Sequence, residues 1–168
     1  MEKKSSNMFW KPSKKYHLDK LKVGYTFTLH GTNWKITEVA QYDWRMDNSS
    51  IEYTIVSSSK EAFLEVELYK GDYELTYSEA ISIEEAYLID AIHTKEIIFQ
   101  NKMYVLDEVY TGDYKNLTTY SSRENLECSL FYAEDEEQLT IEKWEDGSYE
   151  VFLGNELKAK KIKNIKEN

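Results

Sequence analysis

The sequence has few of the residues that cross-link, kink or loosen a chain. Its 168 residues include one cysteine, one proline and six glycines. A single cysteine excludes an intrachain disulfide, and the apolar-polar alternation around Cys128 predicts a buried structural thiol rather than a nucleophile. The scarcity of proline and glycine argues against a disordered chain. We therefore expect a folded protein with an apolar core.

Long apolar runs are also missing. No stretch is long enough to cross a membrane as a helix, and the lysine-rich start lacks the apolar segment of a secretory signal. These absences predict a cytoplasmic protein without a transmembrane segment. Peripheral contact with a membrane through the basic ends is an alternative, because lysines are attracted to anionic surfaces.

The motifs of common enzyme and cofactor sites are absent as well. The three histidines, His17, His30 and His93, have no metal-ligating partner at short spacing, so no metal site is predicted. There is no Gly-rich phosphate loop, nucleophile elbow or paired-cysteine motif. The sequence therefore predicts no cofactor, no catalytic residues and a non-enzymatic protein.

Positive charge is scarce outside the two ends. The formal net charge is −10. Residues 1–22 carry +5 and residues 158–168 carry +4, which leaves −19 for residues 23–157. An acidic body of this kind repels phosphate backbones, so no nucleic-acid partner is expected.

The residues that are abundant favour strands. Apolar residues make up 41% of the chain and aromatic residues 14%, including 14 tyrosines and four tryptophans. Aromatic rings pack well on the half-buried surface of a sheet. Short alternating segments separated by polar turns then indicate an antiparallel, all-β arrangement.

The strand pattern occurs twice in the chain. The offset between the copies grows slowly along the chain, and it grows in polar connections, as insertions in surface loops do. This pattern predicts a duplication. The matching blocks are 27–39 with 97–109, 52–56 with 127–131, 64–67 with 139–142, and 73–75 with 149–151.

The duplication gives the predicted architecture. We expect a mainly β protein made of two tandem repeats of a small antiparallel barrel-like or sandwich unit, with little helix. A basic lead-in would cover residues 1–20, the first repeat and a linker residues 21–90, and the second repeat with a basic end residues 91–168. Residues 78–90 and 155–165 are open between helix and other structure.

Several stretches, taken in order, resemble a known family. They are Leu21-Lys22-Val23-Gly24, Trp34 to Val39, Glu52 to Ile55, Phe63 to Glu67 and Glu142 to Gly147. Together they resemble the bacterial domain of unknown function 4178 family over roughly residues 20 to 165. The resemblance implies a soluble, β-rich protein without an assigned activity, encoded near envelope-stress proteins.

Carboxylates are one set of candidate site residues. If the strands at 51–56 and 62–68 pair, Glu52 and Glu67 lie on one face of the sheet. Two close carboxylates can act as acid and base or bind a hard cation. Glutamate that alternates with leucine or valine is more typical of a solvated strand face, which is the interpretation we favour here.

Aromatic residues in the predicted connections are the other set. Tyr42 and Trp44 fall in one long connection, and Tyr114 and Tyr120 fall in its counterpart. Exposed rings of this kind hold a cationic ligand through their faces, anchor a protein interface, or fold over the open end of a barrel.

Three functions follow from these patterns. The favoured hypothesis is a non-enzymatic interaction or adaptor module with an unidentified protein partner, linked to envelope stress through the family resemblance. The first alternative is an acidic binder of small cations or polyamines. The second alternative is a carboxylate-based enzyme that uses Glu52 and Glu67.

Overall fold

The computed structural model describes residues 15–45, 48–82 and 94–168, and strands make up most of this part. Its two short helical segments are 3-10 turns, η1 at Leu18–Lys20 and η3 at Ala159–Lys161. The strands are β1 Thr26–Leu29, β2 Thr32–Trp44, β3 Asn48–Val56, β4 Glu61–Tyr69, β5 Asp72–Ile81, β6 Glu96–Phe99, β7 Lys102–Asn116, β8 Ser122–Ala133, β9 Gln138–Lys143, β10 Tyr149–Lys158 and β11 Lys163–Lys166.

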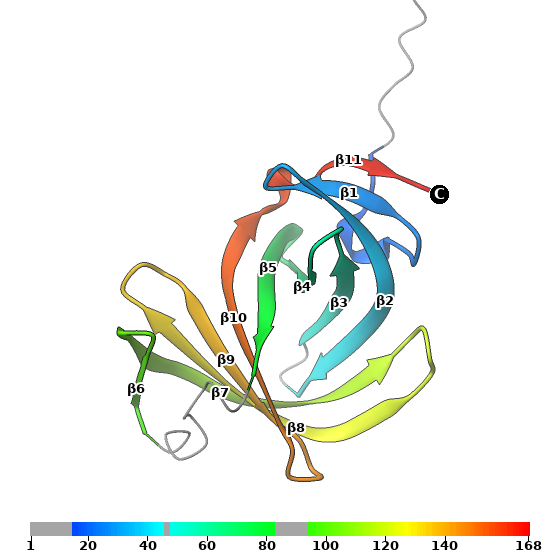
Figure 1. The fold of residues 1–168 in the computed structure, drawn as a ribbon. Helices are drawn as coiled ribbons and strands as arrows, with labels where there is room; N and C mark the ends of the chain where they lie inside the picture. The colour runs from blue at the N-terminus through cyan, green and yellow to red at the C-terminus, as the bar shows by residue number, and fades with distance from the viewer. Residues whose placement is uncertain (1–14, 46–47, 83–93) are drawn as a thin grey trace, which may run out of the picture.

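Eight of the strands close into one antiparallel barrel (Figure 1). The order around it is β2-β3-β4-β5-β10-β9-β8-β7, and pairing of Ala40–Trp44 with Gly112–Asn116 joins β7 back to β2. Strands β1 and β11 extend the sheet beyond β2, and β6 extends it beyond β7. The mainly β, barrel-like prediction with little helix is confirmed. The closed barrel does not by itself show two tandem repeats.

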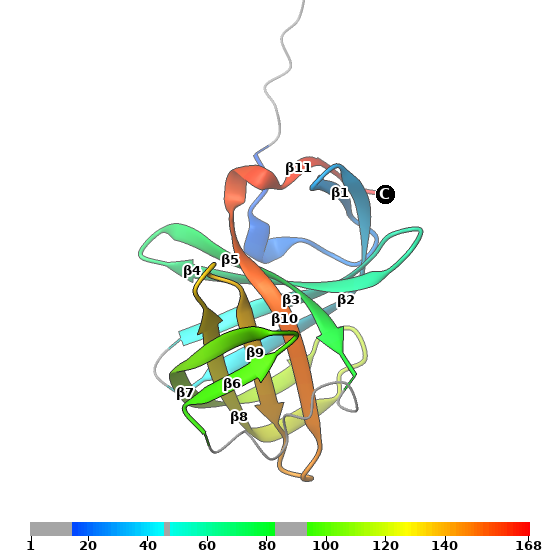
Figure 2. The same ribbon diagram turned by 60° about the vertical axis from the view of Figure 1, so that its left-hand side comes forward.

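One apolar cluster lies on the outer face of β2–β5. It is covered by β1, η1 and β11, which sit above these strands in Figure 2. Strand β4 shows how the sequence builds it: Ala62, Leu64 and Val66 are buried in the cluster, whereas Phe63 and Glu65 line the cavities inside the barrel. Alternation in a strand sends neighbouring side chains to opposite faces.

A second apolar cluster lies on the outer face of β7–β10. Ile97 and Phe99 of β6 pack there against Tyr104, Phe131 and Leu139. Both large apolar cores are thus outside the barrel wall, and the polar residues of the same strands point into the lumen. The hydrophobic effect is satisfied on the outer faces, which leaves the interior free to be polar.

A bulge in β2 decides which side chains enter the lumen. The pairing of β2 with β3 shifts register between Ile36 and Glu38, and β7 with β8 shifts between Leu106 and Glu108. One extra residue in a strand sends every later side chain of that strand to the opposite face of the sheet. Ile36 therefore lies in the outer cluster, whereas Tyr42, further along the strand, lines the lumen.

Glycine is required where the barrel closes. Gly112 pairs with Trp44 across the seam between β2 and β7. A Cβ atom at position 112 would lie 2.5 Å from Trp44 Cε3 and 2.8 Å from the Asp43 carbonyl oxygen. Such distances are below van der Waals contact, so only glycine lets β7 approach the indole this closely.

The segments left open by the sequence are partly resolved. Residues 78–81 continue strand β5, and residues 155–165 contain the end of β10, the 3-10 turn η3 and most of β11. The rest of the predicted linker, 83–90, and most of the lead-in lie outside the described residues. The end of the lead-in docks on the barrel, because Leu18 is buried in the outer cluster. No helix in the described ranges is long and apolar enough to span a membrane.

Candidate functional site

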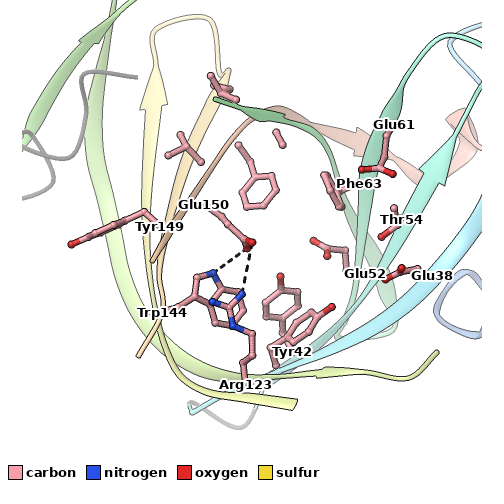
Figure 3. Close-up of a pocket in the computed structure, with 15 residues that line it drawn as sticks. Glu38, Tyr42, Glu52, Thr54, Glu61, Phe63, Arg123, Trp144, Tyr149 and Glu150 are labelled. Atoms are coloured by element: carbon pink, nitrogen blue, oxygen red, sulfur yellow. Dashed lines mark hydrogen bonds and ion pairs between the residues drawn. The ribbon is translucent and has the colours of Figure 1, made fainter. Parts of the chain in front are cut away.

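The barrel lumen holds two cavities, of about 530 and 1190 Å³. Glu52 of β3 and Phe152 of β10 line both cavities, so the two spaces meet at these side chains. Figure 3 shows the smaller cavity with the side chains of opposite walls pointing toward its centre. Concave spaces of this size inside a barrel are where small ligands bind.

Carboxylates from opposite walls point into the lumen. Glu52 and Glu65 are direct partners in the pairing of β3 with β4. Glu67 follows on the same face of β4, and Glu142 of β9 lines the opposite wall. Glu52, Glu65 and Glu67 are half-buried, and the Glu142 side chain is 6% exposed.

Glu142 differs from its neighbours in having a buried oxygen without a hydrogen-bond partner in the described part of the chain. The Ser50 hydroxyl donates to Glu65, and the Asn48 amide donates to Glu67. Among the described residues, Glu142 Oε2 is buried with no hydrogen-bond partner. A buried polar atom without a partner costs about 1–3 kcal/mol, so its place in a lumen calls for an explanation.

The crowding of carboxylates raises their pKa values. Burial, and then the charge of Glu65, raise the pKa of Glu52 to about 8. Burial is also the main cause that raises the pKa of Glu142 well above its usual range, with Glu52 the largest charge contribution. Burial also raises the pKa of Glu65, and the hydrogen bond from Ser50 opposes this rise. A positive charge placed among these groups would favour their ionised forms.

Aromatic rings line the lumen between the carboxylates. Tyr42 stacks on Trp44 with 4.8 Å between ring centroids and an angle of 8° between the planes. Tyr110 meets Trp44 edge-on at 4.8 Å, and Tyr114 meets both Tyr42 at 5.2 Å and Trp144 at 5.6 Å. Ring faces carry partial negative charge, so this cluster adds to the attraction for cations.

One thiol lies beside these rings. Cys128 is 2% exposed, and burial raises the pKa of its thiol well above the usual range. The predicted burial of this cysteine is confirmed. A protonated and enclosed thiol is a poor nucleophile.

The predicted aromatic residues lie where the sequence did not place them. Tyr42, Trp44 and Tyr114 are in strands β2 and β7 and line the lumen, so their assignment to exposed connections was wrong. The connections are shorter than expected because the long strands continue past their bulges. Tyr120 does lie in a turn and is 82% exposed, away from the other three.

The predicted carboxylates lie on one face, as paired strands require. The strands that carry Glu52 and Glu67 do pair, but their solvated face was a wrong interpretation, because that face is the lumen. Sequence reasoning missed Glu65, Glu142, Arg123 and Trp144 as lining residues. The spacing of Glu65 and Glu67 on one strand was the available signal for Glu65. Glu142 and Trp144 lie in a stretch of the family resemblance that assigned them no role, and Arg123 carried no signal.

Comparisons with known proteins agree with the resemblance seen in the sequence. The sequence model described as "Domain of unknown function (DUF4178)" matches residues 22–159. An "Uncharacterized protein" from Aquifex aeolicus (strain VF5) is 28% identical over 156 residues, which cover 88% of this chain and 84% of that protein. No solved structure matches.

Proposed function

This chain belongs to the DUF4178 family, a domain family of unknown function, so its function must be inferred from the residues that line the barrel interior. We propose that the barrel is a non-enzymatic binding module and that its lumen binds a cationic organic ligand. The carboxylates supply charge complementarity, and the aromatic rings supply faces on which an alkylammonium group packs.

The unpartnered oxygen of Glu142 carries this proposal. It is buried in the lumen, and Glu52 and Glu65 both add to the electrostatic strain on it. An ammonium or guanidinium group donates the hydrogen bond that this oxygen lacks and balances the charge at the same time. A bound cation thus removes both the cost of an unpaired buried atom and the repulsion among the carboxylates.

The spread of the carboxylates favours an organic cation over a metal ion. Within the described residues, no group of three or more His, Cys, Asp or Glu side chains is placed to hold a metal. Calcium needs six to eight oxygen ligands converging at 2.3–2.6 Å. Carboxylates set along two joined cavities instead match an extended molecule with more than one amine, such as a polyamine.

Calorimetry tests the proposal with spermidine, Ca²⁺ and Mg²⁺ as probes. We expect spermidine to bind to the wild-type protein, and Glu142→Gln to weaken it at least about tenfold, since a hydrogen bond to a charged group contributes about 1.5–3 kcal/mol. Glu134→Gln, an exposed acid in the turn after β8, is the matched control and should bind as the wild type does. Absence of heat with spermidine, or equal binding by Glu142→Gln, would contradict the proposal.

The other predictions from the sequence keep their place as proposals. A protein partner, a link to envelope stress and a cytoplasmic or membrane-peripheral location remain to be tested directly. The adaptor hypothesis relied on exposed aromatic anchors, and of the four residues only Tyr120 is exposed. The carboxylate enzyme that uses Glu52 and Glu67 is a weaker proposal, because the residue directly opposite Glu52 is Glu65, whereas Glu67 stands opposite Ser50.

We also propose that the barrel descends from a duplicated five-strand unit. Strands β1–β5 correspond in order to β6–β10, and both long strands carry a register shift at equivalent positions. The outer clusters are likewise equivalent, because Phe27 and Ile97 are each buried in the cluster that their short strand covers.

A further inference from the structure

A cation from the chain itself already occupies one end of the lumen. The Arg123 guanidinium carbon lies 3.6 Å from the centroid of the Trp144 ring, which is stacking distance. The Trp144 indole N–H donates to Glu150 Oε2 at 3.0 Å, and Arg123 Nη1 lies 3.8 Å from Glu150 Oε1 (Figure 3). An indole face and a carboxylate therefore form a seat for a flat, doubly donating cation.

Trp144 is held more firmly than the Arg123 side chain that stacks on it. Trp144 is 3% exposed and fixed by its bond to Glu150. Arg123 is held by the turn between β9 and β10, through Ser148 Oγ at 2.9 Å and Asp146 at 3.5 Å. The Asp146 side chain is 66% exposed, and exposed ion pairs contribute little free energy. Leaving the indole therefore costs Arg123 mainly its stacking contact and the Ser148 hydrogen bond, and a ligand guanidinium that takes its place restores the stacking.

The charges around this cavity indicate which class of ligand takes the place of Arg123. Of the described residues that line it, Arg123 is the one cation, facing the carboxylates of Glu38, Glu52, Glu61 and Glu150. Glu52 also lines the larger cavity. A molecule with a guanidinium group at one end and an amine at the other fits both demands, with the planar group on Trp144 and the amine toward Glu52.

We propose that the Trp144–Glu150 seat is a guanidinium subsite, that Arg123 is its resident occupant, and that a ligand carrying its own guanidinium group displaces Arg123. This inference rests on the proposed function and adds the chemical class of the ligand. A planar group stacks on an indole and pairs with a carboxylate through two N–H donors, which a compact ammonium group does not reproduce.

Removal of the resident arginine tests the subsite. Binding of 4-aminobutylguanidine and of 1,4-diaminobutane is measured by calorimetry on the wild-type protein and on Arg123→Ala. We expect Arg123→Ala to bind 4-aminobutylguanidine at least about tenfold more tightly than the wild type, and 1,4-diaminobutane no more than about threefold more tightly. Arg45→Ala removes the same charge from an exposed position and should change neither affinity.

A second substitution keeps the test independent of folding defects. Glu150→Gln changes a half-exposed side chain, and in the Arg123→Ala background it should abolish the gain for 4-aminobutylguanidine, with circular dichroism unchanged. An equal gain for both probes, or a gain that survives Glu150→Gln, overturns the subsite. If spermidine binds in a Glu142-dependent manner while Arg123→Ala fails to discriminate the probes, only the subsite falls. If no cation binds to any variant, the proposed function falls with it.

Discussion

At the residue scale, the feature with the largest consequences is glutamate on the enclosed face of the strands. The two neighbours of Glu65, Leu64 and Val66, are buried in an outer cluster. Ile51 and Tyr53 on either side of Glu52 pack in the same cluster, and Ile141, which precedes Glu142, is buried in the other. The carboxylates are then forced inward by the strict alternation of a strand. The outer cores thus stabilise the fold and hold like charges close together in the lumen.

The raised pKa of Glu52 makes stability depend on pH. Its pKa rises from an ordinary value of 4.5 to about 8 on folding, so between these values the folded protein holds a proton that the unfolded chain releases. The stabilisation present below pH 4.5 is therefore lost as the pH rises toward 8, by up to about 1.4 kcal/mol per pH unit for this group.

We expect Glu52→Gln to flatten this dependence in urea unfolding of the ligand-free protein. Its free energy of unfolding should match that of the wild type near pH 4.5 and exceed it by more than about 1 kcal/mol at pH 8. The exposed control Glu134→Gln should retain the wild-type profile. A wild-type protein whose stability increases from pH 5 to pH 8 would show that these carboxylates are not protonated inside the barrel.

Sequence reasoning identified these residues more readily than their surroundings. The alignment of the two copies pairs Glu52 with Glu127, but Glu127 is exposed and it is the neighbouring Cys128 that lines the lumen. Glu52 and Glu67 themselves do lie on one face. Their burial was not predicted, because the alternation of apolar and polar residues does not by itself say which face of a strand is exposed to solvent. That depends on β1 and β6 covering the apolar side, a long-range contact that no local pattern encodes.

At the element scale, the bulges and the terminal attachments decide the architecture. Trp34 and Ile36 lie on one face of β2 and are buried in the outer cluster. Simple continuation of this alternation would place Tyr42 and Trp44 on the same outer face. The register shift after Ile36 sends them inward instead. A bulge needs only one extra residue, so its position was not evident in the sequence, and the long strands were interpreted as hairpins followed by loops.

The Tyr53 hydroxyl fastens the N-terminal 3-10 turn η1 to the barrel. It donates to the Leu18 carbonyl at 2.8 Å and accepts from the Leu21 N–H at 3.0 Å, and both bonds are buried. We expect Tyr53→Phe to lower the free energy of unfolding by about 2 kcal/mol, because the substitution leaves two buried backbone groups without partners.

Denaturant unfolding and hydrogen exchange measure this effect. The Leu21 amide should exchange faster in Tyr53→Phe, since opening of the segment no longer breaks its bond. Tyr120→Phe, at an 82% exposed position, should change stability by less than about 0.5 kcal/mol. A loss of stability in Tyr53→Phe as small as in the control would mean that the turn is held by apolar contacts alone.

At the scale of the whole molecule, the two halves of the chain are interlocked. Ile81 of β5 packs against the cluster of the second half, and Leu157 of β10 packs against that of the first. The seams between β5 and β10 and between β2 and β7 join the halves on both sides. Neither half is expected to keep its core when the other unfolds.

Thermal unfolding should therefore occur in one cooperative transition. Differential scanning calorimetry is expected to give a ratio of calorimetric to van't Hoff enthalpy close to one, as for a single domain of this size. Circular dichroism and tryptophan fluorescence should report the same midpoint. Two resolved transitions would indicate halves that fold independently, as free-standing tandem repeats would.

The outer and inner faces of the barrel strands differ in what their side chains do, and this difference has an evolutionary consequence. Folding depends on the outward side chains, such as Leu64 and Leu139, whereas the inward ones, such as Glu65 and Glu142, line the cavity to which we assign ligand binding. Adjacent codons thus face separate selection pressures. A lineage that keeps the barrel can exchange its inward residues for a new cargo without first losing foldability, so relatives are expected to diverge in specificity faster than in architecture.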